Sequence, residues 1–115
     1  MKMRLRNLAA AAILAASFSG TASAAEEWAS SNVKFVYPLS NGGFVIGLVD
    51  SPASCTNANN PKYLYVAVGS NGVTQDGAKM MLGVALTGFA AGKRVSVNFD
   101  NSTPNCYVNR LLVTD

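Results

Sequence analysis

The sequence predicts a small α+β domain in which five short strands form a closed or nearly closed β-barrel, with one helix between the third and fourth strands. Three observations carry this prediction. Short runs of β-favouring residues are separated by turns rich in Asn, Gly and Pro. One longer run, from Thr74 to Ala91, has the composition of a helix. Two cysteines, Cys55 and Cys106, can link distant parts of a chain too short to bury a large core.

The first 24 residues have the layout of a secretory signal peptide. Three basic residues within positions 2–6 form its head, residues 8–18 are apolar, and Ala22-Ser23-Ala24 matches a signal-peptidase site. The apolar run is shorter than the roughly 20 residues that a membrane-spanning helix needs. We therefore expect a single domain over residues 25–115, with no transmembrane segment, exported to the periplasm or secreted.

The charge of this domain argues against a nucleic-acid partner. The whole chain has nine Lys and Arg against six Asp and Glu, but three of the basic residues lie in the leader. Residues 25–115 therefore have a net charge near zero. Proteins that bind nucleic acid neutralise phosphates with a basic stripe, and the single Lys93-Arg94 pair does not make one.

The first two strands are expected to form a hairpin. Residues 25–32 show no hydrophobic period and are predicted to run over the surface as a terminal arm. Val33–Tyr37 favours a short edge strand, because a proline ends it. The turn Ser40–Gly43 leads into the strand Phe44–Val49. Within that strand, Gly47 indicates a bend, a bulge or a close backbone approach.

The third strand and the helix come next along the chain. Lys62–Gly69 has apolar or aromatic residues at both odd and even positions, so we expect both of its faces to be covered. Thr74 is predicted to cap a helix that runs to about Ala91. Gly92 then suits the left-handed position that ends a helix.

Two further strands close the domain. Val95–Asp100 alternates cleanly, which places Val95, Val97 and Phe99 inward. A polar loop follows, and Cys106–Thr114 is the last predicted strand.

Cys55 and Cys106 are predicted to form a structural disulfide. An exported chain meets an oxidising environment, where an even number of cysteines usually pairs. Closing a loop of this length stabilises the fold by roughly 4 kcal/mol in the chain-entropy treatment. Since the chain has no His and no Cys-x-x-Cys pair, we expect no metal site.

The predicted helix lacks a polar face. No charged side chain occurs between Lys79 and Lys93, whereas a helix resting on a sheet normally has a solvated side. Three explanations stay open: the helix packs on neighbouring subunits, is buried within the monomer, or contacts a membrane. The candidate residues for an oligomer interface are Met81, Leu82, Ala85, Leu86 and Phe89.

Catalytic chemistry finds little support in these residues. The absence of His excludes a Ser-His or Cys-His nucleophile, and we expect no enzymatic activity and no cofactor. Amides and aromatic rings, in contrast, are the usual means of holding a sugar. The candidate ligand-binding residues are Tyr63, Tyr65, Asn101, Asn105 and Tyr107. The alternative is that the Asn residues make turns and the Tyr residues fill the sheet.

The second half of the chain resembles the B subunits of bacterial AB5 toxins of the cholera and heat-labile enterotoxin type. Thr74 to Asp115 reads as a helix, a Gly-Lys pair, a strand, the loop Asn-Ser-Thr-Pro-Asn at positions 101–105, and a final strand. Ala90–Val95 is also similar to the helix end of the subtilase-cytotoxin B subunit. More broadly, the chain resembles small secreted Gram-negative proteins of unassigned function.

This resemblance covers under half of the domain. It implies an OB-type five-stranded barrel and a ring of subunits whose helices face a central pore. The cysteine placement differs from that of the enterotoxin type, and the residues with which the toxins contact sugars match no position here.

Together these observations predict a non-catalytic, exported binding module with an OB-like barrel. Its expected partners are further copies of itself and a glycan or a host or envelope protein. The alternative is a structural, envelope-associated periplasmic protein without a small-molecule ligand.

Overall fold

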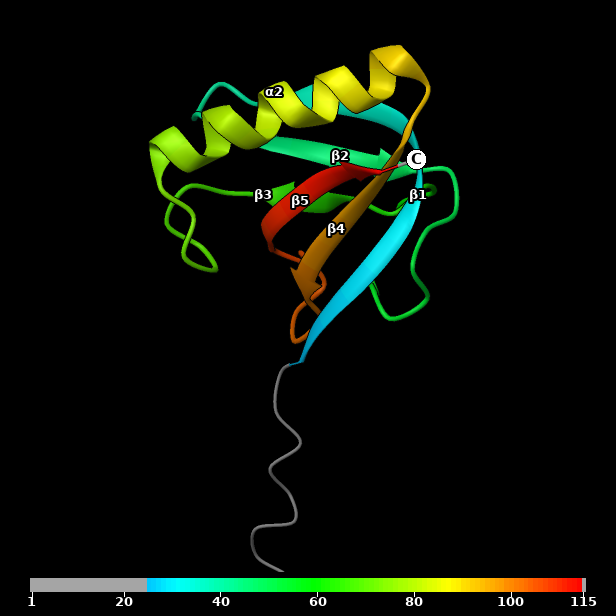
Figure 1. The fold of residues 1–115 in the computed structure, drawn as a ribbon. Helices are drawn as coiled ribbons and strands as arrows, with labels where there is room; N and C mark the ends of the chain where they lie inside the picture. Colours follow the sequence, from blue (N-terminus) through cyan, green and yellow to red (C-terminus); the bar gives the residue numbers. More distant parts are fainter. Residues whose placement is uncertain (1–24, 115) are drawn as a thin grey trace, which may run out of the picture.

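The computed structural model describes residues 25–114, and the expected signal peptide lies outside them. In this part of the chain, five strands form one antiparallel sheet and one helix follows the third strand. Figure 1 shows a curved sheet with the helix lying along one side. The elements are β1 (Glu26–Pro38), β2 (Phe44–Leu48), β3 (Leu64–Val66), α2 (Gln75–Ala91), β4 (Arg94–Asp100) and β5 (Val108–Thr114).

Strand β1 is the centre of the sheet, not its edge. The strand order is β3-β2-β1-β4-β5, so β1 pairs with β4 through its first half and with β2 through its second. The prediction of a terminal arm over residues 25–32 is therefore wrong. This half of β1 does alternate, but its inward residues include two small ones, Ala29, packed against the core, and Ser31, which is fully buried. Ser31 Oγ accepts from Asp50 N at 2.9 Å, which explains how a buried hydroxyl is tolerated.

A bulge divides the two halves of β1. The pairing register with β2 shifts between Val33 and Phe35, so the extra residue Lys34 breaks the alternation. Val33 therefore points into the core, whereas Phe35, two residues on, does not belong to it.

The core lies between the inner face of the sheet and α2. Val95, Val97 and Phe99 are fully buried in it, which confirms the direction predicted for β4. The remaining core side chains come from every other element. They are Val33, Phe44, Ile46, Leu48, Leu64, Val66, Ala78, Ala85 and Val108, with the two cysteines and Val73.

Strand β3 is shorter and less covered than expected. Only Leu64–Val66 pairs as a strand, and the odd-numbered residues Tyr63, Tyr65 and Ala67 are half-buried. The prediction that both faces are covered is therefore wrong, because one face of β3 carries tyrosines at the surface.

The helix α2 begins and ends where the sequence predicts. Thr74 is the N-cap, and its side chain accepts from Gly77 N at 3.0 Å. Gly92 takes the left-handed conformation with φ of 68°, and its N–H and that of Lys93 bond to the last carbonyls. Gly88 lets the helix approach the sheet, since a Cβ there would lie 2.7 Å from Val95 Cγ2.

The disulfide between Cys55 and Cys106 is confirmed, with a Cα–Cα distance of 5.8 Å. It ties the loop after β2 to the loop before β5. The sheet, however, does not close: within residues 25–114 no strand ladder joins β3 to β5. One backbone hydrogen bond, from Tyr65 N to Asn105 O at 3.3 Å, spans this gap.

Candidate ligand-binding site

Four aromatic side chains gather on the outer surface of β1, β2 and β3. Tyr37 pairs with Val45, and Val45 pairs with Tyr65, so these three side chains project from the same face. Phe35 is two residues before Tyr37, and Tyr63 is two residues before Tyr65, which places all four rings together. We call the set Phe35, Tyr37, Tyr63 and Tyr65 the aromatic face.

The rings of the aromatic face contact one another edge to face. Tyr63 is the centre: its ring centroid lies 5.7 Å from that of Phe35, 5.9 Å from that of Tyr37 and 5.9 Å from that of Tyr65. The interplanar angles of these pairs are 63–88°. Such T-shaped contacts stabilise by about 0.5–1.5 kcal/mol each beyond the area they bury. Moving Tyr63 therefore disturbs the whole set.

Gly47 makes room for this cluster. A Cβ at Gly47 would lie 2.4 Å from two carbons of the Phe35 ring, so the ring rests directly on the glycine backbone. Of the roles considered for this glycine, close approach is therefore the one the structure shows. Beside it, Val45 is buried without belonging to the core, because the aromatic face covers it.

Three rings of the aromatic face, those of Phe35, Tyr37 and Tyr63, line an open groove of about 380 Å³ together with Val36 and Pro38. Tyr37 is 46% exposed there. No side chain or backbone group of residues 25–114 hydrogen-bonds the hydroxyls of Tyr37, Tyr63 and Tyr65. The groove and the adjoining ring of Tyr65 therefore offer ring faces together with hydroxyl groups that are available to a ligand.

Asn57 holds the central tyrosine in place. Its side-chain amide bonds both backbone groups of Tyr63: Oδ1 accepts from Tyr63 N at 3.1 Å, and Nδ2 donates to Tyr63 O at 2.8 Å. Nδ2 also donates to Pro104 O at 2.9 Å, across the gap between β3 and β5. The amide thus substitutes for a neighbouring strand beside Tyr63, and the disulfide of Cys55 keeps its loop in position.

The structure separates the five predicted ligand-binding residues. Tyr63 and Tyr65 belong to the aromatic face. Asn105 Nδ2 donates to the hydroxyl of Tyr107 at 2.8 Å, so these two partner each other. Asn101 has a structural role, because it accepts from Ala25 N and donates to Glu27 Oε2 at 2.9 Å.

Sequence reasoning missed Phe35 and Tyr37 as site residues. A signal was present: Phe35-Val36-Tyr37 and Tyr63-Leu64-Tyr65 are both aromatic-x-aromatic triplets with an aliphatic centre. In a strand, such a triplet sets two rings side by side on one face and anchors the middle residue in the core.

The five residues predicted for an oligomer interface also lie in different environments. Ala85 is fully buried in the monomer, and Met81 and Leu82 pack against its core, so three of the five residues face the sheet. Leu86 and Phe89 are exposed. The opposite side of the helix is apolar as well. It consists of Met80, Gly83, Val84 and Thr87, which we call the outer side of α2.

The outer side of α2 borders a second open groove. Its volume is about 630 Å³, and Lys79 and Val113 complete its lining. Met80 is the most exposed large apolar side chain of the described residues, at 72%.

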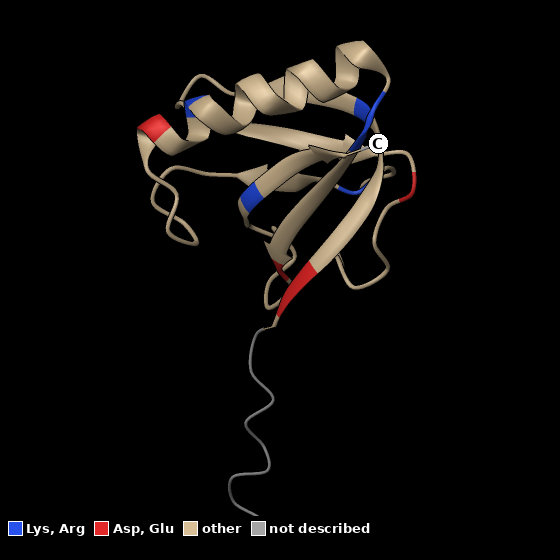
Figure 2. Ribbon diagram, viewed as in Figure 1, with Lys and Arg blue, Asp and Glu red and all other residues tan. Residues whose placement is uncertain are grey.

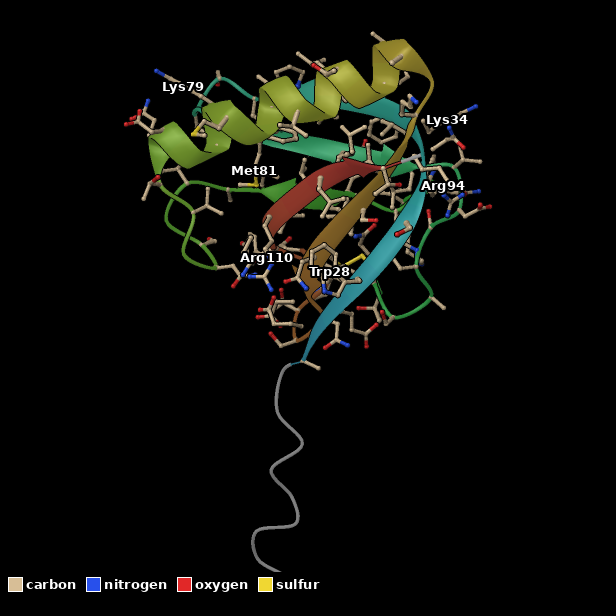
Figure 3. The ribbon with its side chains drawn as sticks, viewed as in Figure 1. Trp28, Lys34, Lys79, Met81, Arg94 and Arg110 are labelled. Atoms are coloured by element: carbon tan, nitrogen blue, oxygen red, sulfur yellow. A yellow bond between two sulfur atoms is a disulfide. The ribbon has the colours of Figure 1, made fainter. Side chains whose placement is uncertain are left out.

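A third cluster fastens the start of β1 to β4 and β5. The Arg110 guanidinium lies 5.4 Å from the centre of the Trp28 ring, and Figure 3 shows the two side chains next to each other. Beneath them, the buried amide of Asn98 donates to Glu26 Oε1 and Asn109 Oδ1 and accepts from Trp28 Nε1. Because every polar atom of this amide has a partner, the cluster is structural.

Within residues 25–114, no group of three or more His, Cys, Asp or Glu side chains is placed to hold a metal ion. None of the helices described is long and apolar enough to cross a membrane. Comparison with family models, with curated proteins and with solved structures found no match to this chain.

Proposed function

We propose that this chain is an exported, non-catalytic binding module, and that the aromatic face is its ligand site. The observation that carries the proposal is the gathering of four aromatic rings and three available tyrosine hydroxyls on one open surface. Soluble proteins seldom leave such a cluster exposed without a use for it.

The chemistry of the site favours a neutral, hydroxyl-rich ligand, and we take this to be a glycan. Aromatic faces pack on the C–H faces of sugars, and tyrosine hydroxyls both donate to and accept from sugar hydroxyls. None of the four side chains is charged. The charged residues are spread over the domain without a basic stripe, as Figure 2 shows, which disfavours an oligonucleotide.

The fold supports an OB-like description of the module. We take the sheet to be an OB-type barrel left open between β3 and β5, and the strand order β3-β2-β1-β4-β5 with the helix between β3 and β4 supports this. OB folds bind oligosaccharides and oligonucleotides over the face of their second and third strands. The aromatic face takes two rings from β1 and two from β3 and the residue before it, with β2 between them, so it covers part of this surface.

The test is binding to a glycan array and to individual oligosaccharides by calorimetry, with the oxidised protein. Tyr37→Ala is the informative variant, because Tyr37 is exposed and its loss should leave the fold intact. We expect at least a tenfold loss of affinity. Tyr107→Ala is the matched control, since that tyrosine lies outside the aromatic face and should bind as the wild type does. Equal binding by Tyr37→Ala and wild type would place the ligand elsewhere.

The second candidate function is a structural, envelope-associated role in the periplasm. The exposed outer side of α2 favours it, because an apolar surface of this kind suits contact with other proteins. Fractionation separates the two candidates. Wild-type protein that stays with envelope fractions, and loses this association on Val84→Glu but not on Tyr37→Ala, would favour the structural role.

A further inference from the structure

The outer side of α2 presents a protrusion and a hollow one turn apart. Met80 projects into solvent, and next to it a Cβ on Gly83 would meet no atom within 4 Å. The hydroxyl of Thr87 needs no further acceptor, because it already donates to Gly83 O at 2.8 Å. Apart from Lys79 at its margin, the lining of this groove therefore has no polar side chain without a partner.

The spacing along this side is that of a helix-pairing seam. Asp76, Met80, Gly83, Thr87 and Ala90 follow one another at intervals of four, three, four and three residues. This repeat keeps one stripe of a helix in contact with a partner helix. Small residues at three of the five positions allow the two backbones to approach closely.

We propose that two copies of this chain pair through α2, with the helices antiparallel about a two-fold axis at Gly83. In this arrangement Met80 of each copy enters the hollow formed by Gly83 and Thr87 of the other. A two-fold contact makes the same interaction twice, which suits a patch that carries both the protrusion and the hollow.

The charges at the helix ends select the antiparallel direction. The last turn of α2 has no basic residue of its own, although its exposed carbonyls attract positive charge. The antiparallel pair places Lys79 of one copy beside this last turn of the other. It also brings Asp76 toward the partner's basic Lys93-Arg94 end. A parallel pair would instead set Asp76 against Asp76 and Lys79 against Lys79.

The other occupants are less favoured by these residues. A membrane surface would call for a row of basic residues beside the apolar side, and Lys79 is the only one lining the groove. A ring of more than two subunits would need the protrusion to meet a different surface of its neighbour.

Sedimentation equilibrium of the oxidised protein, residues 25–115, tests the pairing between about 1 and 500 μM. We expect the mass to rise to twice that of the monomer. Met80→Glu should weaken the association at least tenfold, since it puts a carboxylate into the seam of both copies. Leu112→Glu, also at an exposed apolar residue but outside the groove, should leave it unchanged. Circular dichroism checks that both variants fold.

Cross-linking with a short bis-maleimide tests the geometry. Gly83→Cys should cross-link efficiently, because the two-fold axis brings this position next to its own counterpart. Ala91→Cys should not, because its two copies would lie about 24 Å apart along the helices at 1.5 Å per residue. A monomer at all concentrations, a larger ring, or cross-linking through Ala91→Cys alone would overturn the proposal. Tyr37→Ala should still pair, which separates this result from the fate of the glycan site.

Discussion

Removing the side-chain amide of Asn57 should free the backbone of Tyr63 and so destabilise the aromatic face. Asn57→Ala deletes the bonds to Tyr63 N, Tyr63 O and Pro104 O, of 2.8–3.1 Å. A net stabilisation of about 1 kcal/mol for each bond gives a loss of 2–3 kcal/mol, with some recovered by water at this half-buried site. For a domain of this size, that loss corresponds to a fall in Tm of about 10–20 °C.

The assay is urea unfolding of the oxidised protein, followed by the fluorescence of Trp28, the one tryptophan of the chain. Asn59→Ala is the matched control, because Asn59 lies in the same loop and its side chain is exposed. It contributes only its backbone N–H to Asn57, so its stability should stay within about 0.5 kcal/mol of the wild type. If Asn57→Ala were equally mild, the amide would not be what holds Tyr63, and the reasoning would be refuted.

Asn57→Asp adds a pH test. The new carboxylate keeps the acceptor but sets a second oxygen against two carbonyl oxygens, so at pH 7 this variant should be less stable than Asn57→Ala. A protonated carboxyl can donate to one of those carbonyls. Folding therefore favours the neutral form and raises its pKa above the unfolded value of about 3.9. The contribution of the protonated carboxyl to the stability of Asn57→Asp is fully present below that unfolded value and is lost as pH rises through the folded pKa. The difference in free energy of unfolding between wild type and Asn57→Asp should shrink from pH 7 to pH 4. A difference that does not change with pH would contradict this account.

Three other outcomes are expected. Gly83→Ala and Gly88→Ala raise helix propensity by the same amount, about 1 kcal/mol. Thermal unfolding of the monomer should show that Gly83→Ala is stabilised. Gly88→Ala should be destabilised by about 1–3 kcal/mol, because a Cβ at Gly88 lies 2.7 Å from Val95 Cγ2. Changes of the same sign in both variants would contradict this reasoning. Gly47→Ala should expel the Phe35 ring and lower both stability and glycan affinity, measured by unfolding and calorimetry, whereas unchanged near-ultraviolet dichroism would argue against it. Reduction of the disulfide should cost roughly 4 kcal/mol in urea unfolding, and a loss below about 1 kcal/mol would show that other contacts restrain the two loops.

Local signals in the sequence predict local structure well in this chain. The cap Thr74, the terminator Gly92 and the alternation of Val95, Val97 and Phe99 each act through neighbours in the sequence, and all are confirmed. The first half of β1 escaped notice for a physical reason. Its inward residues include Ala29 and Ser31, so the alternation is one of size and exposure and not of hydrophobicity.

The faces of α2 could not be told apart by polarity. The fully buried residues of the helix are its small ones, Ala78, Ala85 and Gly88, and at Gly88 the sheet leaves no space for a larger side chain. Met80 is larger and more apolar than these, yet it remains outside. Hydrophobicity alone therefore placed three of the five interface candidates, Met81, Leu82 and Ala85, on the side that packs on the sheet, and the shape of the sheet was needed to tell the sides apart.

The position of β1 at the centre of the sheet has a consequence for how the chain folds. Glu26 pairs with Asp100, and Asn32 with Arg94, so the middle of the sheet joins residues 62–74 positions apart. Contacts of such high sequence separation form late and slow folding. The domain cannot complete its sheet until nearly all of the chain is available. If the chain is exported as proposed above, this dependence on nearly the whole sequence would keep the domain unfolded until its last strand is available.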